Sequence, residues 1–181
     1  MNPKINKDKA INALLFVASK TGGEIDIHRL SKILYFADQK HLIRYGRPIT
    51  RDQYVPMDKG PVPSKVYDYF KAVRSNKETP LKNYCAEYFD VENWMHFIMK
   101  EQPNLEMLSE SEIECLSESI IENKDLGHDE LIFKSHDAAY EQARSHSHSR
   151  LSFLEMAKVA GASEEMLNYI QLKQENERAE L

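Results

Sequence analysis

One stretch of the chain, residues 26–63, places the strongest limits on the fold. A helix is expected to begin at Asp26, because apolar side chains then recur at helical spacing, at Ile27, Leu30, Ile33, Leu34 and Ala37. Gly46 stands where a helix C-cap glycine belongs, and Arg47-Pro48 and Pro56 interrupt any continuation. The sequence therefore predicts a long helix that gives way directly to an extended, turning segment.

The segment after this helix predicts a small β element. Residues 49–55 are expected to form a short strand, because they include the β-prone side chains Ile49, Thr50, Tyr54 and Val55. Gly60-Pro61-Val62-Pro63 is expected to be a rigid turn, and Ser64 to cap the next helix. Four polar residues of the preceding helix are assigned to its wetter positions: His28, Lys32, Asp38 and Lys40.

The rest of the chain is mostly helical by the same criteria. An N-terminal helix is expected to end at Gly22-Gly23, and residues 84–100 are read as two short strands around a turn at residues 90–93. Serines that match capping patterns are expected to open later helices, at Ser109, Ser152 and Ser163, with short helices between them at residues 129–133 and 137–144. The prediction is a single domain, residues 1–181, of the α+β class, predominantly α-helical with a small antiparallel β element.

Composition excludes several classes of protein. The 181 residues are 41% hydrophobic and 29% charged, which is too apolar for a disordered chain and too polar for a membrane protein. A net charge of −5 disfavours a general nucleic-acid-binding surface. The two cysteines, Cys85 and Cys115, give no disulfide framework and are assigned to the core. We therefore expect a protein of the cytoplasm, with no membrane partner.

No motif for catalysis or for a cofactor is found. The sequence lacks a phosphate loop, a dinucleotide-binding glycine motif and a nucleophile elbow. The densest histidine cluster, His146-Ser147-His148, has no cysteine or acidic ligand at zinc spacing and is read as a solvated turn. The expectation is a protein that is not an enzyme and that holds no cofactor and no metal.

A helix-turn-helix is the one nucleic-acid-binding motif to weigh. Residues 154–170 resemble it, with Ser163 capping the recognition helix. Its first turn would present Glu164 and Glu165 to phosphate oxygens, and no Lys or Arg follows until Lys173. Two core helices joined by a glycine turn are the preferred interpretation. A DNA-binding regulator using residues 163–169 stays an alternative.

Residues 30–67 resemble a known family. The blocks at residues 30–38, 45–50 and 54–63, with His41, Val66 and Tyr67, are similar to the Panacea domain of the SocA-like antitoxins, which also occurs in phage-associated proteins. Weaker similarity follows at Leu108-Ser109 and at residues 133–140, where Tyr140 replaces the usual tryptophan. The core spacing of the apolar residues indicates that most of this pattern marks the fold.

The resemblance implies an α-rich α+β domain that neutralises a cognate protein toxin by direct binding. In one branch of the family the antitoxin is instead an adaptor that delivers the toxin to the ClpXP protease. The leading hypothesis is therefore a non-enzymatic antitoxin, with a DNA-binding regulator and an adaptor for a ClpXP-type protease as alternatives. The identity of the toxin and the oligomeric state stay open.

The partner is expected to dock between Gly46 and Gly60. Side chains of the types enriched at interfaces gather there: Arg47, Arg51, Tyr54, Met57 and Lys59. With Arg44 they form a locally basic cluster, which would attract an acidic face of the partner. The alternative is an ordinary solvated loop with Tyr54 packed on the core. Under the docking hypothesis, Arg51→Glu combined with Tyr54→Ala abolishes binding and leaves melting nearly intact.

Overall fold

A computed structural model of the chain describes residues 5–146 and 150–179. These residues form nine α-helices, one short 3-10 helix and five short strands, so the predicted mainly helical α+β class is confirmed. The elements, in chain order, are α1 (Lys7–Ser19), β1 (Glu24–Asp26), α2 (Ile27–Tyr45), β2 (Tyr54–Met57), β3 (Gly60–Pro63), α3 (Ser64–Arg74), α4 (Pro80–Ala86), β4 (Phe89–Glu92), β5 (His96–Met99), η1 (Leu105–Met107), α5 (Glu110–Asn123), α6 (His128–Ser135), α7 (Ala138–Ser145), α8 (Phe153–Val159) and α9 (Glu164–Ala179).

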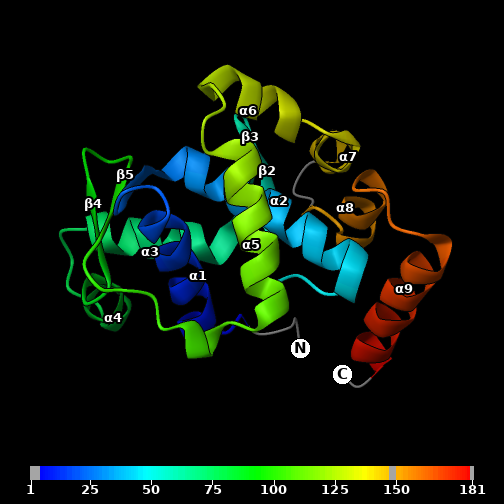
Figure 1. Cartoon of the computed structure of the whole chain (residues 1–181), viewed down its shortest axis with the longest axis horizontal. Coiled ribbons are helices and arrows are strands. Elements are labelled where there is room, and N and C mark those ends of the chain that lie inside the picture. The colour runs from blue at the N-terminus through cyan, green and yellow to red at the C-terminus, as the bar shows by residue number, and fades with distance from the viewer. Residues whose placement is uncertain (1–4, 147–149, 180–181) are drawn as a thin grey trace.

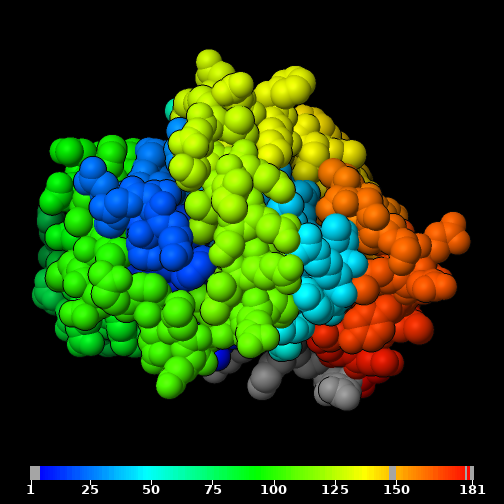
Figure 2. All heavy atoms as spheres, in the orientation of Figure 1, coloured from blue at the N-terminus to red at the C-terminus, as the bar shows by residue number. Residues whose placement is uncertain are grey.

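Helix α2 is the centre of the molecule, and the other elements pack on its different sides (Figure 1). One hydrophobic cluster joins its Leu30 and Ile33 to α1, α3, α5 and the strands β4 and β5. A second cluster joins Tyr35 and Phe36 to β2 and to helices α6–α9. In the space-filling view, α5 crosses the front face between α1 and the C-terminal half of α2 (Figure 2). The two clusters explain why α2 is buried along most of its length.

The strands form two small antiparallel sheets. A three-stranded sheet has the order β1-β5-β4, with Glu24 opposite Ile98 and Phe89 opposite Met99. The second sheet is the hairpin β2–β3, with Tyr54 opposite Pro63. The two strands predicted within residues 84–100 are thus present at 89–99, although residues 84–86 belong to α4.

The predicted limits of α2 are confirmed. The Asp26 side chain accepts a hydrogen bond from the Arg29 amide, and Gly46 ends the helix in the left-handed conformation at φ 64°. Ser109 forms the predicted capping box with Glu112. Ser163 accepts from the Met166 amide, as expected at the start of the last helix.

Three expectations near the hairpin were wrong. The first strand begins at Tyr54 rather than at residue 49, and residues 60–63 pair as strand β3 instead of forming only a turn. Ser64 is the first residue of α3 and not its cap. The amide groups of Lys65 and Val66 donate to the Asp52 carboxylate, at 2.9 Å each, so an aspartate twelve residues earlier caps this helix. Among the described residues, no helix is long and apolar enough to cross a membrane.

Candidate partner-binding site

Three of the four α2 side chains expected to face water, His28, Lys32 and Asp38, are instead buried, whereas the fourth, Lys40, is 20% exposed. Lys32, Asp38 and His41 are at most 1% exposed, and His28 is 8% exposed. The hairpin β2–β3 and the loop before it lie along α2, and buried backbone groups need hydrogen-bond partners. The spacing of apolar residues along α2 could not predict this burial, because the polar side chains form hydrogen bonds with backbone groups of a different segment.

These buried side chains fix residues 47–61 in place. The Lys32 ammonium donates to the Pro61 carbonyl at 2.8 Å, and a ring nitrogen of His28 lies 3.0 Å from the Lys59 carbonyl oxygen. Farther along α2, Asp38 accepts from the Ile49 amide at 2.6 Å and from the Tyr54 hydroxyl at 2.8 Å. The backbone of the hairpin and of the loop before it is therefore held by α2 itself.

Burial changes the titration of two of these groups. Desolvation lowers the pKa of Lys32 to about 7. Desolvation raises the pKa of Asp38 to about 7, although the hydrogen bonds from Tyr54 and Ile49 oppose the change. Both groups bind the protein's own backbone or side chains, which is a structural role.

Two of the five predicted partner-binding residues are committed to internal contacts. Tyr54 is fully buried, so its side chain is not available to a partner in this structure. Arg47 donates to the buried Glu112 carboxylate at 2.7 Å, which Lys9 also contacts at 2.8 Å. The carboxylate of Glu112 thus neutralises part of the positive charge expected to attract a partner.

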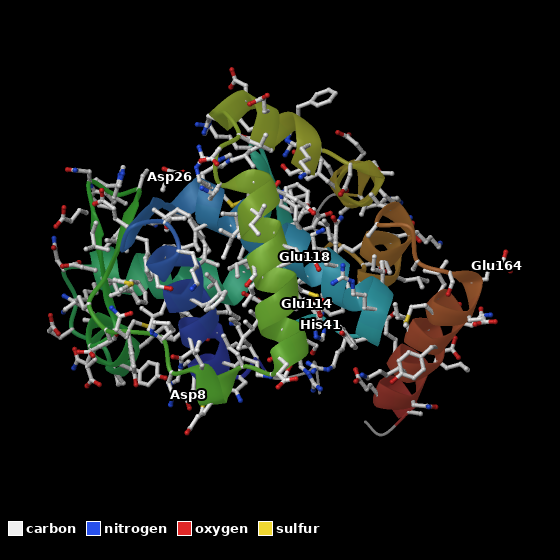
Figure 3. All side chains as sticks on the ribbon, viewed as in Figure 1. Asp8, Asp26, His41, Glu114, Glu118 and Glu164 are labelled. Atoms are coloured by element: carbon white, nitrogen blue, oxygen red, sulfur yellow. The ribbon has the colours of Figure 1, made fainter. Side chains whose placement is uncertain are left out.

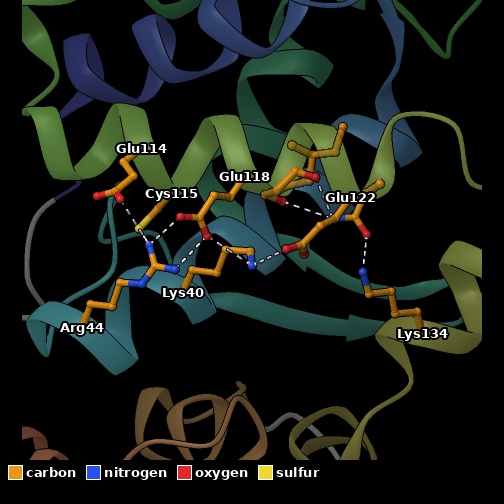
Figure 4. Close-up of polar contacts among 10 residues, drawn as sticks. Lys40, Arg44, Glu114, Cys115, Glu118, Glu122 and Lys134 are labelled. Atoms are coloured by element: carbon orange, nitrogen blue, oxygen red, sulfur yellow. Dashed lines mark hydrogen bonds and ion pairs between the residues drawn. The ribbon is translucent and has the colours of Figure 1, made fainter.

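Arg44 is also paired with carboxylates of the same chain, at the surface between α2 and α5. It pairs with Glu118 at 2.7 Å and approaches Glu114 at 4.0 Å, while the neighbouring Lys40 contacts Glu122 at 2.6 Å (Figure 4). The glutamates stand four residues apart along α5, where like charges repel. The cations of α2 offset this repulsion, so the ion pairs join the two helices rather than forming a free basic surface.

Arg51, Met57 and Lys59 remain exposed, but they do not form one cluster. Arg51 follows the C-terminal end of α2, and its backbone has a positive φ of 57°. Met57 and Lys59 lie at the hairpin tip, near His28 at the other end of α2. Residues 28 and 46 are about 27 Å apart along a helix. Within the described residues, Arg51 and Lys59 take part in no ion pair.

Arg51 borders a groove between the end of α2, the loop that follows, and α9, here called the α2–α9 groove. Its apolar lining comes from Leu42, Pro48, Phe153 and Ile170. Three cationic side chains, Arg47, Arg51 and Lys173, and one acidic side chain, Glu177, also line it. Because Arg47 is paired with Glu112, the positive charge of the groove rests on Arg51 and Lys173 against Glu177, which still leaves a net positive charge beside the apolar surface.

Sequence reasoning missed the contribution of α9 to this groove. Gly46 allows the close contact, because a Cβ atom there would lie 2.4 Å from the Tyr169 ring. Ile170 of α9 is buried, at 2% exposed, and Lys173, three residues later on the same helix, lines the groove. The available signal was the helical spacing of Met166, Ile170 and Lys173, which share one face.

The structure describes only part of the proposed histidine turn, because Ser147 and His148 lie outside the described residues. Among the described residues, no group of three or more His, Cys, Asp or Glu side chains could hold a metal ion. Cys85 and Cys115 are free and buried, as predicted, and burial raises the pKa of Cys85 to about 11. These thiols are core residues.

The helix pair α8–α9 presents carboxylates where a recognition helix would meet phosphates. Glu164 projects outward from the first turn of α9 (Figure 3), and Glu165 beside it is also exposed. Phosphate groups would be repelled there. Two core helices joined by a glycine turn therefore stay the preferred interpretation of this pair, and a DNA-binding regulator stays the disfavoured alternative.

The fold is thus a mainly helical α+β domain in which a central helix holds a short β hairpin through buried polar side chains. Residues 30–141 match the family described as antitoxin SocA-like, Panacea domain. The match covers more than half of the 181 residues, and the chain belongs to this family. No curated protein and no solved structure matches the chain.

Proposed function

We propose that this protein is the antitoxin of a toxin–antitoxin pair and that it neutralises its cognate toxin by binding it, without catalysis. Membership of the SocA-like antitoxin family is the observation that carries the proposal. The structure is compatible with binding without catalysis, because the buried polar side chains of α2 form hydrogen bonds to the loop and hairpin of the same chain. Such a scaffold offers a rigid surface for a protein partner.

The α2–α9 groove is the proposed contact surface for the toxin. Arg51 is exposed and free of internal ion pairs among the described residues, and Lys173 lies across the groove. The apolar lining suits an aliphatic or aromatic side chain of the partner. We therefore expect the toxin to present an apolar anchor beside acidic residues, as charge complementarity requires.

Expression of the adjacent genes tests the function. A neighbouring gene is expected to arrest growth when expressed alone and to be harmless when expressed together with this protein. Co-purification of the two products should then yield a stable complex. If every adjacent gene product is harmless alone, the antitoxin proposal is wrong.

Charge reversal at the groove tests the contact surface. Arg51→Glu is expected to weaken toxin binding by about 30-fold or more, the loss of one good interface residue. Lys77→Glu is the matched control, because Lys77 is exposed on the loop between α3 and α4, away from the groove. Binding is measured by titration calorimetry. Equal affinities for the two variants would place the contact elsewhere while leaving the antitoxin function standing.

A further inference from the structure

Helix α6 exposes an aromatic side chain that the core does not use. Phe133 is 85% exposed, while Leu131 and Ser135 of the same helix are fully buried. Phe133 lines an open groove of about 610 Å³ between α6 and α7, here called the α6–α7 groove, with Ile132, Asp129, His136, Asp137 and Glu141. Aromatic side chains are enriched at the centres of protein interfaces, so Phe133 beside this groove offers an apolar contact for a partner.

The carboxylates of this groove lack internal cations. Asp129, Asp137 and Glu141 take part in no ion pair within the described part of the chain. Asp137 accepts hydrogen bonds from the Tyr35 hydroxyl at 2.9 Å and from the Gln39 amide at 2.8 Å. Both donors are neutral groups, so no cation offsets the charge of this carboxylate. The glutamates of α5 differ in this respect, because lysines and arginines contact them.

The cation that lines the groove is occupied elsewhere. The Lys134 ammonium donates to the Asn123 side chain at 2.6 Å, and it lies 4.5 Å from the centre of the Phe36 ring. His136 supplies a further polar group. Its ring stacks on Tyr140 at 4.2 Å, and its Nε2 atom is buried without a hydrogen-bond partner among the described residues. Among the described residues, neither Lys134 nor His136 therefore forms an ion pair with the carboxylates of the groove.

We propose that the α6–α7 groove is a second docking surface, which binds a positively charged segment of a partner protein that also carries an apolar side chain. The apolar side chain packs on Phe133 and Ile132, and lysine or arginine side chains pair with Asp129 and Glu141. This surface is opposite in charge to the α2–α9 groove. One domain could therefore hold two partner segments of different chemistry at once, which goes beyond neutralisation of a single toxin.

A synthetic peptide of alternating arginine and leucine tests the surface on the full chain. Fluorescence anisotropy of the labelled peptide is expected to show binding, and amide NMR shifts are expected to concentrate in residues 129–141. Asp129→Asn with Glu141→Gln should weaken binding at least about tenfold. Glu164→Gln with Glu165→Gln removes the same charge from α9 and should leave binding unchanged.

Phe133→Ser tests the apolar part of the surface against Leu172→Ser, because Leu172 is also exposed, at 59%. Only Phe133→Ser is expected to weaken binding, by about tenfold or more. Melting curves should be unchanged for both variants. The proposal is overturned if a glutamate–leucine peptide binds equally well, if the NMR shifts lie outside residues 129–141, or if the control variants weaken binding as much as the groove variants. These outcomes do not bear on the toxin contact at Arg51.

Discussion

The ammonium nitrogen of Lys32 lies 2.8 Å from the carbonyl oxygen of Pro61, in a site from which solvent is excluded. No carboxylate of the described residues forms an ion pair with it. A lysine is seldom fully buried without such a partner, because removing its charge from water is costly. The hydrogen bond links strand β3 to the central helix. It also keeps the Lys32 amine in a buried site, where the charged form is disfavoured.

The burial of Lys32 makes the stability of the protein depend on pH. The pKa of Lys32 is about 7 in the folded protein and near the ordinary 10.5 in the unfolded chain. Between these values the unfolded chain binds more protons, so the free energy of unfolding rises with pH, by up to about 1.4 kcal/mol per pH unit. Lys32→Met should remove this slope, and Lys77→Met should keep it. Urea titrations at pH 7 and pH 9 measure the difference, and equal slopes for the two variants would contradict it.

Asp38 makes the free energy of unfolding fall as the pH rises, which is opposite to the effect of Lys32, and it does so at lower pH. Its folded pKa of about 7 exceeds the ordinary 3.8, so the folded protein binds more protons between these values. The contribution of Asp38 is therefore fully present below about pH 4 and is lost as the pH rises through 7. Asp38→Asn is expected to abolish this part of the pH dependence, whereas the exposed Asp125→Asn should not. Denaturant midpoints between pH 4.5 and 7.5 test the prediction, which fails if both variants retain the wild-type slope.

Gly60 should tolerate no side chain. Its φ is +99°, and a Cβ atom would lie 2.5 Å from the Ser135 hydroxyl and 2.9 Å from the Lys32 side chain. Gly60→Val should therefore cost about 2–3 kcal/mol, which lowers the melting temperature by about 5–10 °C. Gly60→Ala and Gly22→Ala form a matched pair, because Gly22 has a similar φ of +90° but no atom near the added Cβ. Equal losses in that pair would show that the contacts at Gly60 add nothing.

The architecture around α2 could be predicted because local signals fix it. Its cap at Asp26, its apolar spacing and the left-handed Gly46 are all properties of short stretches of sequence. The burial of Lys32 and Asp38 could not be predicted, because it depends on a hairpin that folds back along the helix. The cap of α3 could not be predicted either. A helix cap is expected directly before the first turn, whereas Asp52 lies twelve residues before the start of α3.

The candidate site was harder to predict for the same reason. Arg47 and Arg51 do line one groove, but the wall that completes it comes from α9, more than a hundred residues later. Composition alone could not show that Glu112 and Glu118 neutralise Arg47 and Arg44, because both contacts link distant segments. The types of residue between Gly46 and Gly60 were enough to select Arg51. Only the fold shows which of the cationic side chains there form ion pairs within the chain.

Tyr54 illustrates the consequence for mutagenesis. Because Tyr54 is fully buried and donates to Asp38, Tyr54→Ala should destabilise the protein by about 3–5 kcal/mol, and not leave melting nearly intact. Tyr54→Phe keeps the ring and loses only the hydroxyl, so a smaller cost of about 1–3 kcal/mol is expected. Thermal melts of the two variants measure this order. Near-native melting of Tyr54→Ala would show that the site is not part of the core.

The buried carboxylate of Glu112 joins three segments of the chain. One carboxylate oxygen accepts from Lys9 at 2.8 Å and from Arg47 at 2.7 Å, and the other accepts from the Ser109 amide at 2.9 Å. Burial alone would raise the pKa of Glu112, but these hydrogen bonds hold it below its ordinary value. The stabilisation is therefore present above about pH 4.5 and is lost as the pH falls through the lowered pKa.

Glu112→Gln leaves Lys9 and Arg47 without their anion, and it should cost about 2–4 kcal/mol at pH 7. The matched control is Glu114→Gln on the same helix, because the Glu114 side chain is 58% exposed and lies 4.0 Å from Arg44. Exposed pairs of that kind contribute at most about 1 kcal/mol. Urea denaturation at pH 7 and pH 3.5 should show a large difference between the variants at pH 7 that narrows in acid, as the wild-type carboxylate becomes protonated. A Glu112→Gln variant no less stable than Glu114→Gln at pH 7 would mean that the buried carboxylate does not hold α1, α5 and the loop at Arg47 together.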